Sequence, residues 1–272
     1  MKSQEEKCRQ FRDLHSRDRT FIIPNPWDAG SAKVLESLGF ESLATTSSGF
    51  ANSLGRLDGE VSLFEKLDHC RSLCEVTSIP VSADFENGFA DDPETVATNL
   101  LLLAETGVAG CSIEDFGNGH IYEFMLAVER VEAAVEAARS LPVPFTLTAR
   151  AENLIHGVDD LDDTIRRLEA FEAAGADVLY APGTRSMDQV AAIIDAVTRP
   201  INVLCATLPG VTLEEYEAAG VRRVSVGGAI ARYAMTATVS AGREMLEKGT
   251  FSYLKGLMPA RDAAAMLGAR SD

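Results

Sequence analysis

The 272-residue sequence lacks several features that would assign it to a familiar class. No apolar run approaches the length of a membrane-spanning helix, and the opening MKSQEEKCRQ is not an apolar leader, so we expect a cytoplasmic protein with no membrane partner. Basic residues are scarce: 25 Lys and Arg stand against 41 Asp and Glu, a formal net charge of −16. So acidic a surface repels phosphate backbones, and we therefore expect no nucleic-acid partner.

Cysteine is also sparse, with five residues that show no paired-ligand spacing. Cys70 and Cys74 are four apart on an expected helix, but no second pair matches them, so we expect reduced thiols and not a zinc site or disulfides. A glycine-rich phosphate loop is missing after the first expected strand, which argues against an open dinucleotide-binding sheet. The segment SVGGAI is only a weak version of a barrel phosphate loop.

What the sequence does contain is a regular alternation of short apolar runs with amphipathic segments of helical length. We predict eight strands, at residues 21–24, 42–46, 81–84, 110–114, 145–150, 178–181, 201–205 and 223–227. Eight such units with short connections predict one (β/α)8-barrel domain over residues 1–272, with its core at about 20–230. Additional C-terminal helices, at 231–272, lie beyond the barrel and need another surface to pack against, such as a neighbouring subunit.

Polar side chains occur at the C-terminal ends of the predicted strands, where barrel enzymes place their active sites. Strand 81–84 ends in Asp84, strand 110–114 in Glu114 and strand 145–150 in Arg150. Side chains two apart share a face of a strand, so Ser82 points with Asp84 and Ser112 points with Glu114. We expect Asp84, Glu114 and Arg150 to face the mouth of the barrel.

Asp58, in the loop LGRLDGE after the second strand, adds a third carboxylate to Asp84 and Glu114. Three carboxylates in one small volume repel one another unless a cation compensates them. A few direct carboxylates completed by waters and substrate oxygens are typical of Mg²⁺, with Mn²⁺ as the alternative ion. The competing interpretation is that Asp84 caps a helix, Glu114 pairs with a helix cation and Asp58 lies in a turn. For the three acids together, the sequence favours a metal site.

Hydroxyl groups and a guanidinium complete this predicted site. Thr46, Ser47 and Ser48 follow the second strand, and their hydroxyls and backbone N–H groups suit a carboxylate or phosphonate, although a solvated turn would have the same composition. Arg150 is the one Arg predicted at an inward strand end, and its planar fork suits a carboxylate. These groups predict a pocket that binds a small dianion.

Two further side chains belong to the same predicted rim. Trp27 follows the first strand and could form a wall of the substrate pocket, although core packing is equally expected. His120, in the glycine-containing loop FGNGHIYEF, is a candidate acid–base group, with an ordinary surface position as the more expected alternative. His15, His69 and His156 have no comparable setting.

The motifs NPWDAGSAKVLESLGF, TTSSGFANSLGRLDGE, SADFENGF, GCSIEDF and TARAEN follow one another between about residues 21 and 231. In these motifs the chain resembles the isocitrate lyase/phosphoenolpyruvate mutase superfamily. The resemblance implies a Mg²⁺-dependent barrel that acts on a small 2-oxo acid through an enolpyruvate-type intermediate. It also implies a homo-oligomer, tetramer or dimer, in which a terminal helix is exchanged. It places metal ligands at Asp84, Asp58 and Glu114 and substrate contacts at Thr46–Ser48 and Arg150.

Departures from the family pattern bear on the reaction. Ser82 stands where many members have the first acid of an Asp-x-Asp run, and Glu86 and Asn87 stand where Thr-Gly is usual. The stretch DFGNGHIYEF lacks the Cys-bearing loop of the lyase branch and the Lys-Thr-Asn-Ser loop of the mutase branch. Cleavage of isocitrate or methylisocitrate, and phosphonate rearrangement, are therefore not expected.

We predict a Mg²⁺-dependent carbon–carbon lyase that decarboxylates or hydrolyses an oxaloacetate-like acid. Loss of CO₂ needs no dedicated base in place of the missing Cys. Two alternatives remain: cleavage or transfer of a carbon–phosphorus bond, as in phosphonopyruvate hydrolase or phosphoenolpyruvate mutase, and a non-catalytic barrel that binds 2-oxo acids.

Overall fold

The computed structural model describes residues 2–268, and the predicted barrel is confirmed. Eight parallel strands follow the order β1-β10-β9-β8-β7-β4-β3-β2 around a nearly closed ring. At the remaining gap, the Ala44 N–H donates to the Pro24 carbonyl at 3.0 Å, which joins the ends of β2 and β1. The strands are β1 (Phe21–Ile23), β2 (Leu43–Ala44), β3 (Val81–Asp84), β4 (Gly110–Glu114), β7 (Thr146–Arg150), β8 (Val178–Tyr180), β9 (Ile201–Leu204) and β10 (Arg223–Ser225).

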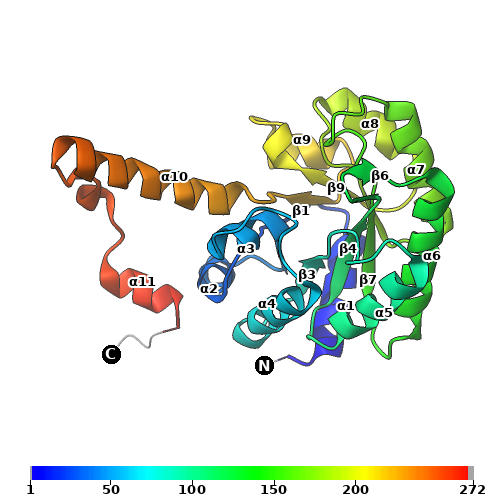
Figure 1. Ribbon diagram of the computed structural model, residues 1–272, viewed down its shortest axis with the longest axis horizontal. Helices are drawn as coiled ribbons and strands as arrows, with labels where there is room; N and C mark the ends of the chain where they lie inside the picture. The colour runs from blue at the N-terminus through cyan, green and yellow to red at the C-terminus, as the bar shows by residue number, and fades with distance from the viewer. Residues whose placement is uncertain (1, 269–272) are drawn as a thin grey trace.

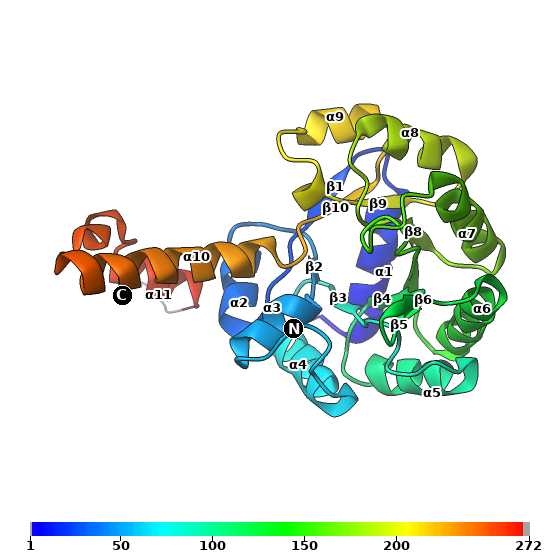
Figure 2. The same ribbon diagram turned by 45° about the horizontal axis from the view of Figure 1, so that its top comes forward.

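Helices between the strands surround this ring (Figures 1 and 2). They are α2 (Ala29–Ser37), α4 (Leu63–Val76), α5 (Pro93–Ala104), α6 (Phe124–Ser140), α7 (Leu161–Ala173), α8 (Met187–Ala196) and α9 (Leu213–Ala218), with the short 3₁₀ turn η1 (Cys205–Thr207) before α9. Helix α5 illustrates how local sequence starts these helices. The Asp92 side chain accepts the Thr95 N–H, and Pro93 occupies the first turn. Its buried face, which includes Val96 and Leu100, packs into the main core.

One helix that the sequence patterns did not predict precedes the barrel. In α1 (Gln4–Ser16), Ser3 and Glu6 form a reciprocal capping box at the start of the helix. Phe11 and Leu14 pack with Phe21 of β1 in a separate apolar cluster. In Figure 2, α1 lies across the ring of strands, and it shields the barrel on the side away from the strands' C-terminal ends.

Two short elements shape the C-terminal end of the barrel. Residues expected as a loop after β2 form helix α3 (Ser47–Ser53), which Thr46 caps by accepting the Gly49 N–H at 3.3 Å. After β4 the chain makes a hairpin of β5 (Phe116–Gly117) and β6 (His120–Ile121). Its turn residues Asn118 and Gly119 both have positive φ, 51° and 81°, as a two-residue hairpin turn requires.

Beyond β10 the chain leaves the barrel as a C-terminal arm, residues 229–266. The arm consists of α10 (Ala229–Arg243), the π-helical turn η2 (Glu244–Lys248), the 3₁₀ turn η3 (Ser252–Gly256) and α11 (Ala260–Met266). Figures 1 and 2 both show α10 projecting away from the ring, and none of the arm's elements has a buried residue. Tyr233 and Leu246 are 78% and 88% exposed. Among the described residues, no helix is long and apolar enough to span a membrane.

Candidate active site

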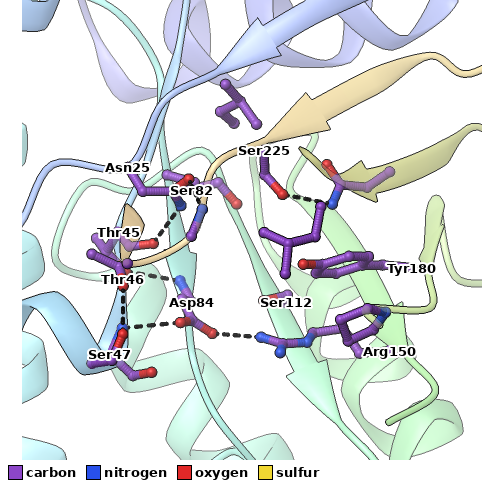
Figure 3. Close-up of a pocket in the computed structure, with 18 of the residues that line it drawn as sticks. Asn25, Thr45, Thr46, Ser47, Ser82, Asp84, Ser112, Arg150, Tyr180 and Ser225 are labelled. Carbon is purple, nitrogen blue, oxygen red and sulfur yellow. Dashed lines mark hydrogen bonds and ion pairs between the residues drawn. The ribbon is translucent and has the colours of Figure 1, made fainter. Parts of the chain in front are cut away.

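Two adjoining cavities, of about 250 and 570 Å³, lie at the C-terminal ends of the barrel strands. We call them the inner and the outer cavity. Ser47, Asp58, Arg150 and Ile155 line both, so the two cavities form one continuous site. Polar side chains on the wall of the inner cavity include Asn25, Thr45, Ser82, Ser112, Tyr180 and Ser225 (Figure 3). Asn202, Arg223 and apolar residues such as Leu204 complete the wall.

Arg150 is the centre of the charge network at this site. Its Nη1 lies 2.8 Å from Asp84 Oδ1 and 3.2 Å from Glu114 Oε1, and its Nε donates to Glu152 Oε1 at 2.7 Å. Only 13% of the Arg150 side chain is exposed. Burial lowers the pKa of Arg150, but the three carboxylates outweigh burial and hold it well above the usual value. One guanidinium therefore neutralises part of the charge of three acids.

Asp84 is fixed from both sides at the end of β3 (Figure 3). Besides Arg150, its second carboxylate oxygen accepts the Ser47 N–H at 3.0 Å, and its own N–H donates to Thr45 Oγ1 at 2.8 Å. Burial raises the pKa of Asp84, but Arg150, Lys66 and the Ser47 N–H together hold it below the usual value. Asp84 is therefore an anion within a mostly buried site.

Other carboxylates at the site are less completely compensated. Glu114 has Arg150 as its ion-pair partner, yet burial raises its pKa well above the usual value. Burial likewise raises the pKa of Glu86 to about 7, with Asp84 and Asp58 adding to the effect. Lys66 of α4 has no exposed surface, and in the described part of the chain its Nζ has no hydrogen-bond partner. Its charge lowers the pKa of Asp84 and Glu86 from behind the site.

The donor chemistry of this site fits Mg²⁺. The cations near the cavities are Arg150 and Arg223 on the walls and Lys66 behind them, and they are fewer than the acids on the walls, which are Asp58, Asp84, Glu86, Glu114 and Glu152. Within residues 2–268 no three Asp, Glu, His or Cys side chains are already gathered as a metal cluster. Asp84 and Glu114 instead turn toward Arg150. Mg²⁺ commonly uses one or two carboxylates together with waters and substrate oxygens, so a preformed trio is not required.

The hydroxyl groups predicted to contact substrate lie on the cap and first turn of α3. Thr46, Ser47 and Ser48 all line the inner cavity, and the Thr46 and Ser48 hydroxyl oxygens are 3.3 Å apart. Gly228 faces them closely, because a Cβ added there would come within 2.5 Å of Ser48 Oγ. Backbone N–H groups of a first helical turn and these hydroxyls are suitable donors for a carboxylate.

The structure places two other candidates away from the cavities. In the part of the chain that the structure describes, Trp27 lines neither cavity; it is half-buried, and its carbonyl oxygen lies 3.0 Å from His69 Nε2. His120 is exposed on β6, with its Nδ1 3.4 Å from the Asn118 carbonyl and its ring against Tyr122. His120 is likewise not among the residues that line the described cavities.

Sequence reasoning missed two residues of the outer cavity. Glu152 is only 1% exposed, and its backbone N–H is held by Asp115 Oδ1 at 2.7 Å. His156 lies against it, with His156 Nε2 3.7 Å from Glu152 Oε2. Glu152 shares strand parity with Arg150 and could have been found from the sequence. His156 lies within a turn, at residues 153–157, where no periodicity predicts the direction of a side chain.

Comparison with known proteins shows which sequences and structures this chain is similar to. The sequence model described as phosphoenolpyruvate phosphomutase matches residues 11–246. A crystal structure from Burkholderia cenocepacia J2315, provisionally named a lyase/mutase, is 51% identical, with a TM-score of 0.95 over 98% of this chain and 97% of that one.

Two better-defined relatives bear on the reaction. An oxaloacetate decarboxylase of Paraburkholderia xenovorans is 30% identical and matches over 71% of this chain and 67% of that protein. The structure of oxaloacetate acetylhydrolase with its product oxalate is 28% identical, with a TM-score of 0.86 over 98% of this chain and 94% of that one. Another relative, 27% identical over 74% of this chain, is named 2-methylisocitrate lyase.

Proposed function

The chain belongs to the isocitrate lyase/phosphoenolpyruvate mutase superfamily, and from that premise we propose that it is a Mg²⁺-dependent carbon–carbon lyase. Its substrate is a small 2-oxo acid of the oxaloacetate type, which it decarboxylates through an enolpyruvate-type intermediate or cleaves by hydrolysis of a carbon–carbon bond. One observation carries this proposal: at the barrel mouth five acids line the same cavities as Arg150, which pairs with Asp84, Glu114 and Glu152. Burial raises the pKa of Glu114, Glu86 and Asp58, and a bound divalent cation would favour their ionised forms.

We assign a separate role in binding the cation or the substrate to each group of residues at the site. Asp84, with Asp58 and Glu114, would hold the cation, which when bound supplies the positive charge that stabilises an enolate. The donors on the Thr46–Ser48 turn would bind and orient the substrate carboxylate. Arg150 would exchange part of its pairing with Asp84 and Glu114 for a substrate oxygen. The polar inner cavity, about 250 Å³ in volume, has room for an acid of this size.

Two features favour cleavage of a carbon–carbon bond over a carbon–phosphorus bond. The β5–β6 hairpin is short, and its turn consists of Asn118 and Gly119, so it brings no Lys to the site for a phosphonate. The relatives that support the family assignment also include enzymes named for action on oxaloacetate. Decarboxylation needs only a stabilised enolate and a later proton donor.

The test is to assay oxaloacetate, phosphonopyruvate and a panel of small 2-oxo acids with and without Mg²⁺, with pyruvate detected by lactate dehydrogenase and the products of hydrolysis, such as oxalate, by chromatography. We expect Mg²⁺-dependent release of pyruvate from oxaloacetate. Asp84→Ala should abolish it, whereas Asp68→Ala, on the exposed face of α4 where the side chain is 78% exposed, should retain it. Full activity in Asp84→Ala would refute the proposal. Turnover of phosphonopyruvate alone would assign the carbon–phosphorus reaction, and tight binding without turnover would indicate a binding protein.

We also infer that a second copy of this chain covers the C-terminal arm. The arm exposes large apolar side chains along its length, including Tyr233, Leu246, Phe251 and Leu257. Contiguous exposed apolar surface of this kind is typical of subunit interfaces. An exchange of arms between two or four chains would bury it.

A further inference from the structure

The proposed reaction needs a proton donor, and the family-type Cys is absent from the hairpin. Decarboxylation of a 2-oxo acid leaves an enolate whose carbon must gain a proton before product forms. A donor has to reach the cavities that hold Asp84 and Arg150, and it has to exchange its proton with solvent. Imidazole is the side chain that most often transfers protons near neutral pH, so each histidine is compared with these two requirements.

His156 meets both requirements. Its ring is part of the wall of the outer cavity, together with Glu114 and Arg150. The ring stacks on Phe116 of the hairpin, with centroids 3.5 Å apart and planes within 10°, so its orientation is fixed. About 35% of the side chain remains exposed, which leaves an edge open to solvent for proton exchange.

Glu152 gives His156 a fixed polar partner. Glu152 Oε1 accepts from Arg150 Nε at 2.7 Å, and Oε2 lies 3.7 Å from His156 Nε2. The 3.7 Å separation is an ion-pair distance and is longer than a hydrogen bond. Hydrogen bonds of catalytic groups often tighten only when substrate binds, and a small shift of the ring would bring His156 into hydrogen-bond distance of Glu152, which would then orient it.

Several titratable groups lie close to His156. Burial and the Arg150 guanidinium both lower the pKa of His156. Burial raises the pKa of Glu152, with Arg150 opposing that rise. Glu114, Glu86 and Asp58 also line the outer cavity, and burial raises the pKa of each.

No other histidine offers the same geometry. His120 lies on β6 and contacts the Asn118 carbonyl and the Tyr122 ring. His15 and His69 are buried, and burial lowers the pKa of each to about 3. Neither buried ring can exchange a proton with solvent at neutral pH.

We propose that His156, oriented by Glu152, is the acid–base residue that transfers a proton to and from the carbon next to the 2-oxo group. This inference rests on the proposed function. In decarboxylation of oxaloacetate, the C3–C4 bond breaks, CO₂ leaves, and the electron pair remains in the enolate. The imidazolium proton of His156 then forms the new C3–H bond, and solvent reprotonates the ring at its exposed edge.

The proton step can be measured without bond cleavage, because the same transfer in reverse exchanges hydrogen on a ketone product. We would incubate the full-length protein with 2-oxobutyrate and Mg²⁺ in D₂O and follow exchange at C3 by proton NMR. The wild type should exchange one of the two C3 hydrogens selectively. His156→Gln should lower that rate about 10²–10⁴-fold, the usual contribution of general acid–base catalysis. His120→Gln, a matched change outside the cavities, should exchange like the wild type.

Two controls distinguish a role of His156 in proton transfer from a purely structural role. Mg²⁺ affinity measured by calorimetry should be the same in His156→Gln and the wild type, because His156 is not among the proposed ligands. Imidazole added to His156→Ala should restore part of the exchange, which a purely structural role would not produce.

The outcomes separate this inference from the proposed function. Wild-type exchange rates in His156→Gln, loss of exchange in His120→Gln, or no exchange by the wild type would each overturn the role of His156. If exchange depends on His156 but oxaloacetate is not cleaved, the proton role stands and the carbon–carbon lyase assignment fails. Continued CO₂ release by His156→Gln, with exchange lost, would support both.

Discussion

Replacement of Arg150 by Met removes the cation on which three buried carboxylates depend. The guanidinium lies 2.8 Å from Asp84, 3.2 Å from Glu114 and 2.7 Å from Glu152, with 13% of its side chain exposed. Removal of one partner from a buried ion pair typically costs about 3–5 kcal/mol. We expect the free energy of unfolding of Arg150→Met to fall by about that amount at pH 8 without Mg²⁺.

The pH dependence of this loss follows from the sign of the pKa shifts. Arg150 lowers the pKa of Asp84, Glu114 and Glu152, so its removal raises all three. An acid with a raised pKa in the folded protein binds more protons there than in the unfolded chain. The free energy of unfolding then falls as pH rises from the unfolded pKa, about 4, through the folded value. The defect of Arg150→Met should therefore be largest at pH 8 and smallest near pH 5.

Urea unfolding followed by circular dichroism at pH 5 and pH 8 measures this difference. Arg139→Met is a matched control, because Arg139 pairs with Asp177 at a partly exposed position, and surface ion pairs contribute about 0–1 kcal/mol. Equal losses for Arg150→Met at both pH values, or a loss below about 0.5 kcal/mol at pH 8, would refute the charge network described here.

Two further predictions concern the cation and the arm. Mg²⁺ should bind more tightly at pH 8 than at pH 6, because the proposed ligand Glu114 has a raised pKa and must release a proton that competes with the ion. The nearby Glu86, whose pKa is about 7, also becomes an anion over this range and attracts the ion. Calorimetry at the two pH values would show the difference, and equal affinity would count against Glu114 as a ligand. Leu246→Glu, at a position 88% exposed in a single chain, should shift the protein toward smaller assemblies in light scattering; a wild-type protein that is monomeric would contradict the proposed exchange of arms.

Much of the barrel could be predicted because its strands are short apolar runs bounded by polar residues and glycine. Strands β3 and β4 begin and end at the predicted residues. Helix α1 escaped prediction although Ser3 and Glu6 form a capping box there. The β5–β6 hairpin also escaped, although an Asn-Gly turn is a strong hairpin signal, because strands of two residues leave no alternation to detect.

At the site, strand parity succeeded where the backbone is extended and failed beyond it. Asp84 and Arg150 lie at strand ends, and their inward direction follows from the two-residue repeat. The direction of His156 depends on a turn after β7 and on its stacking against Phe116, neither of which has a sequence period. The buried position of Lys66 was equally hidden, because a Lys within a helix is usually solvated.

A crystal of the protein soaked with Mn²⁺ and oxalate tests the central claim most directly, since anomalous scattering would locate the ion. We predict an ion in the joined cavities with an Asp84 carboxylate oxygen as a direct ligand, and oxalate between the ion and the Thr46–Ser48 turn. Cavities without an ion, with Asp84 still paired to Arg150 and Ser47, would contradict the account.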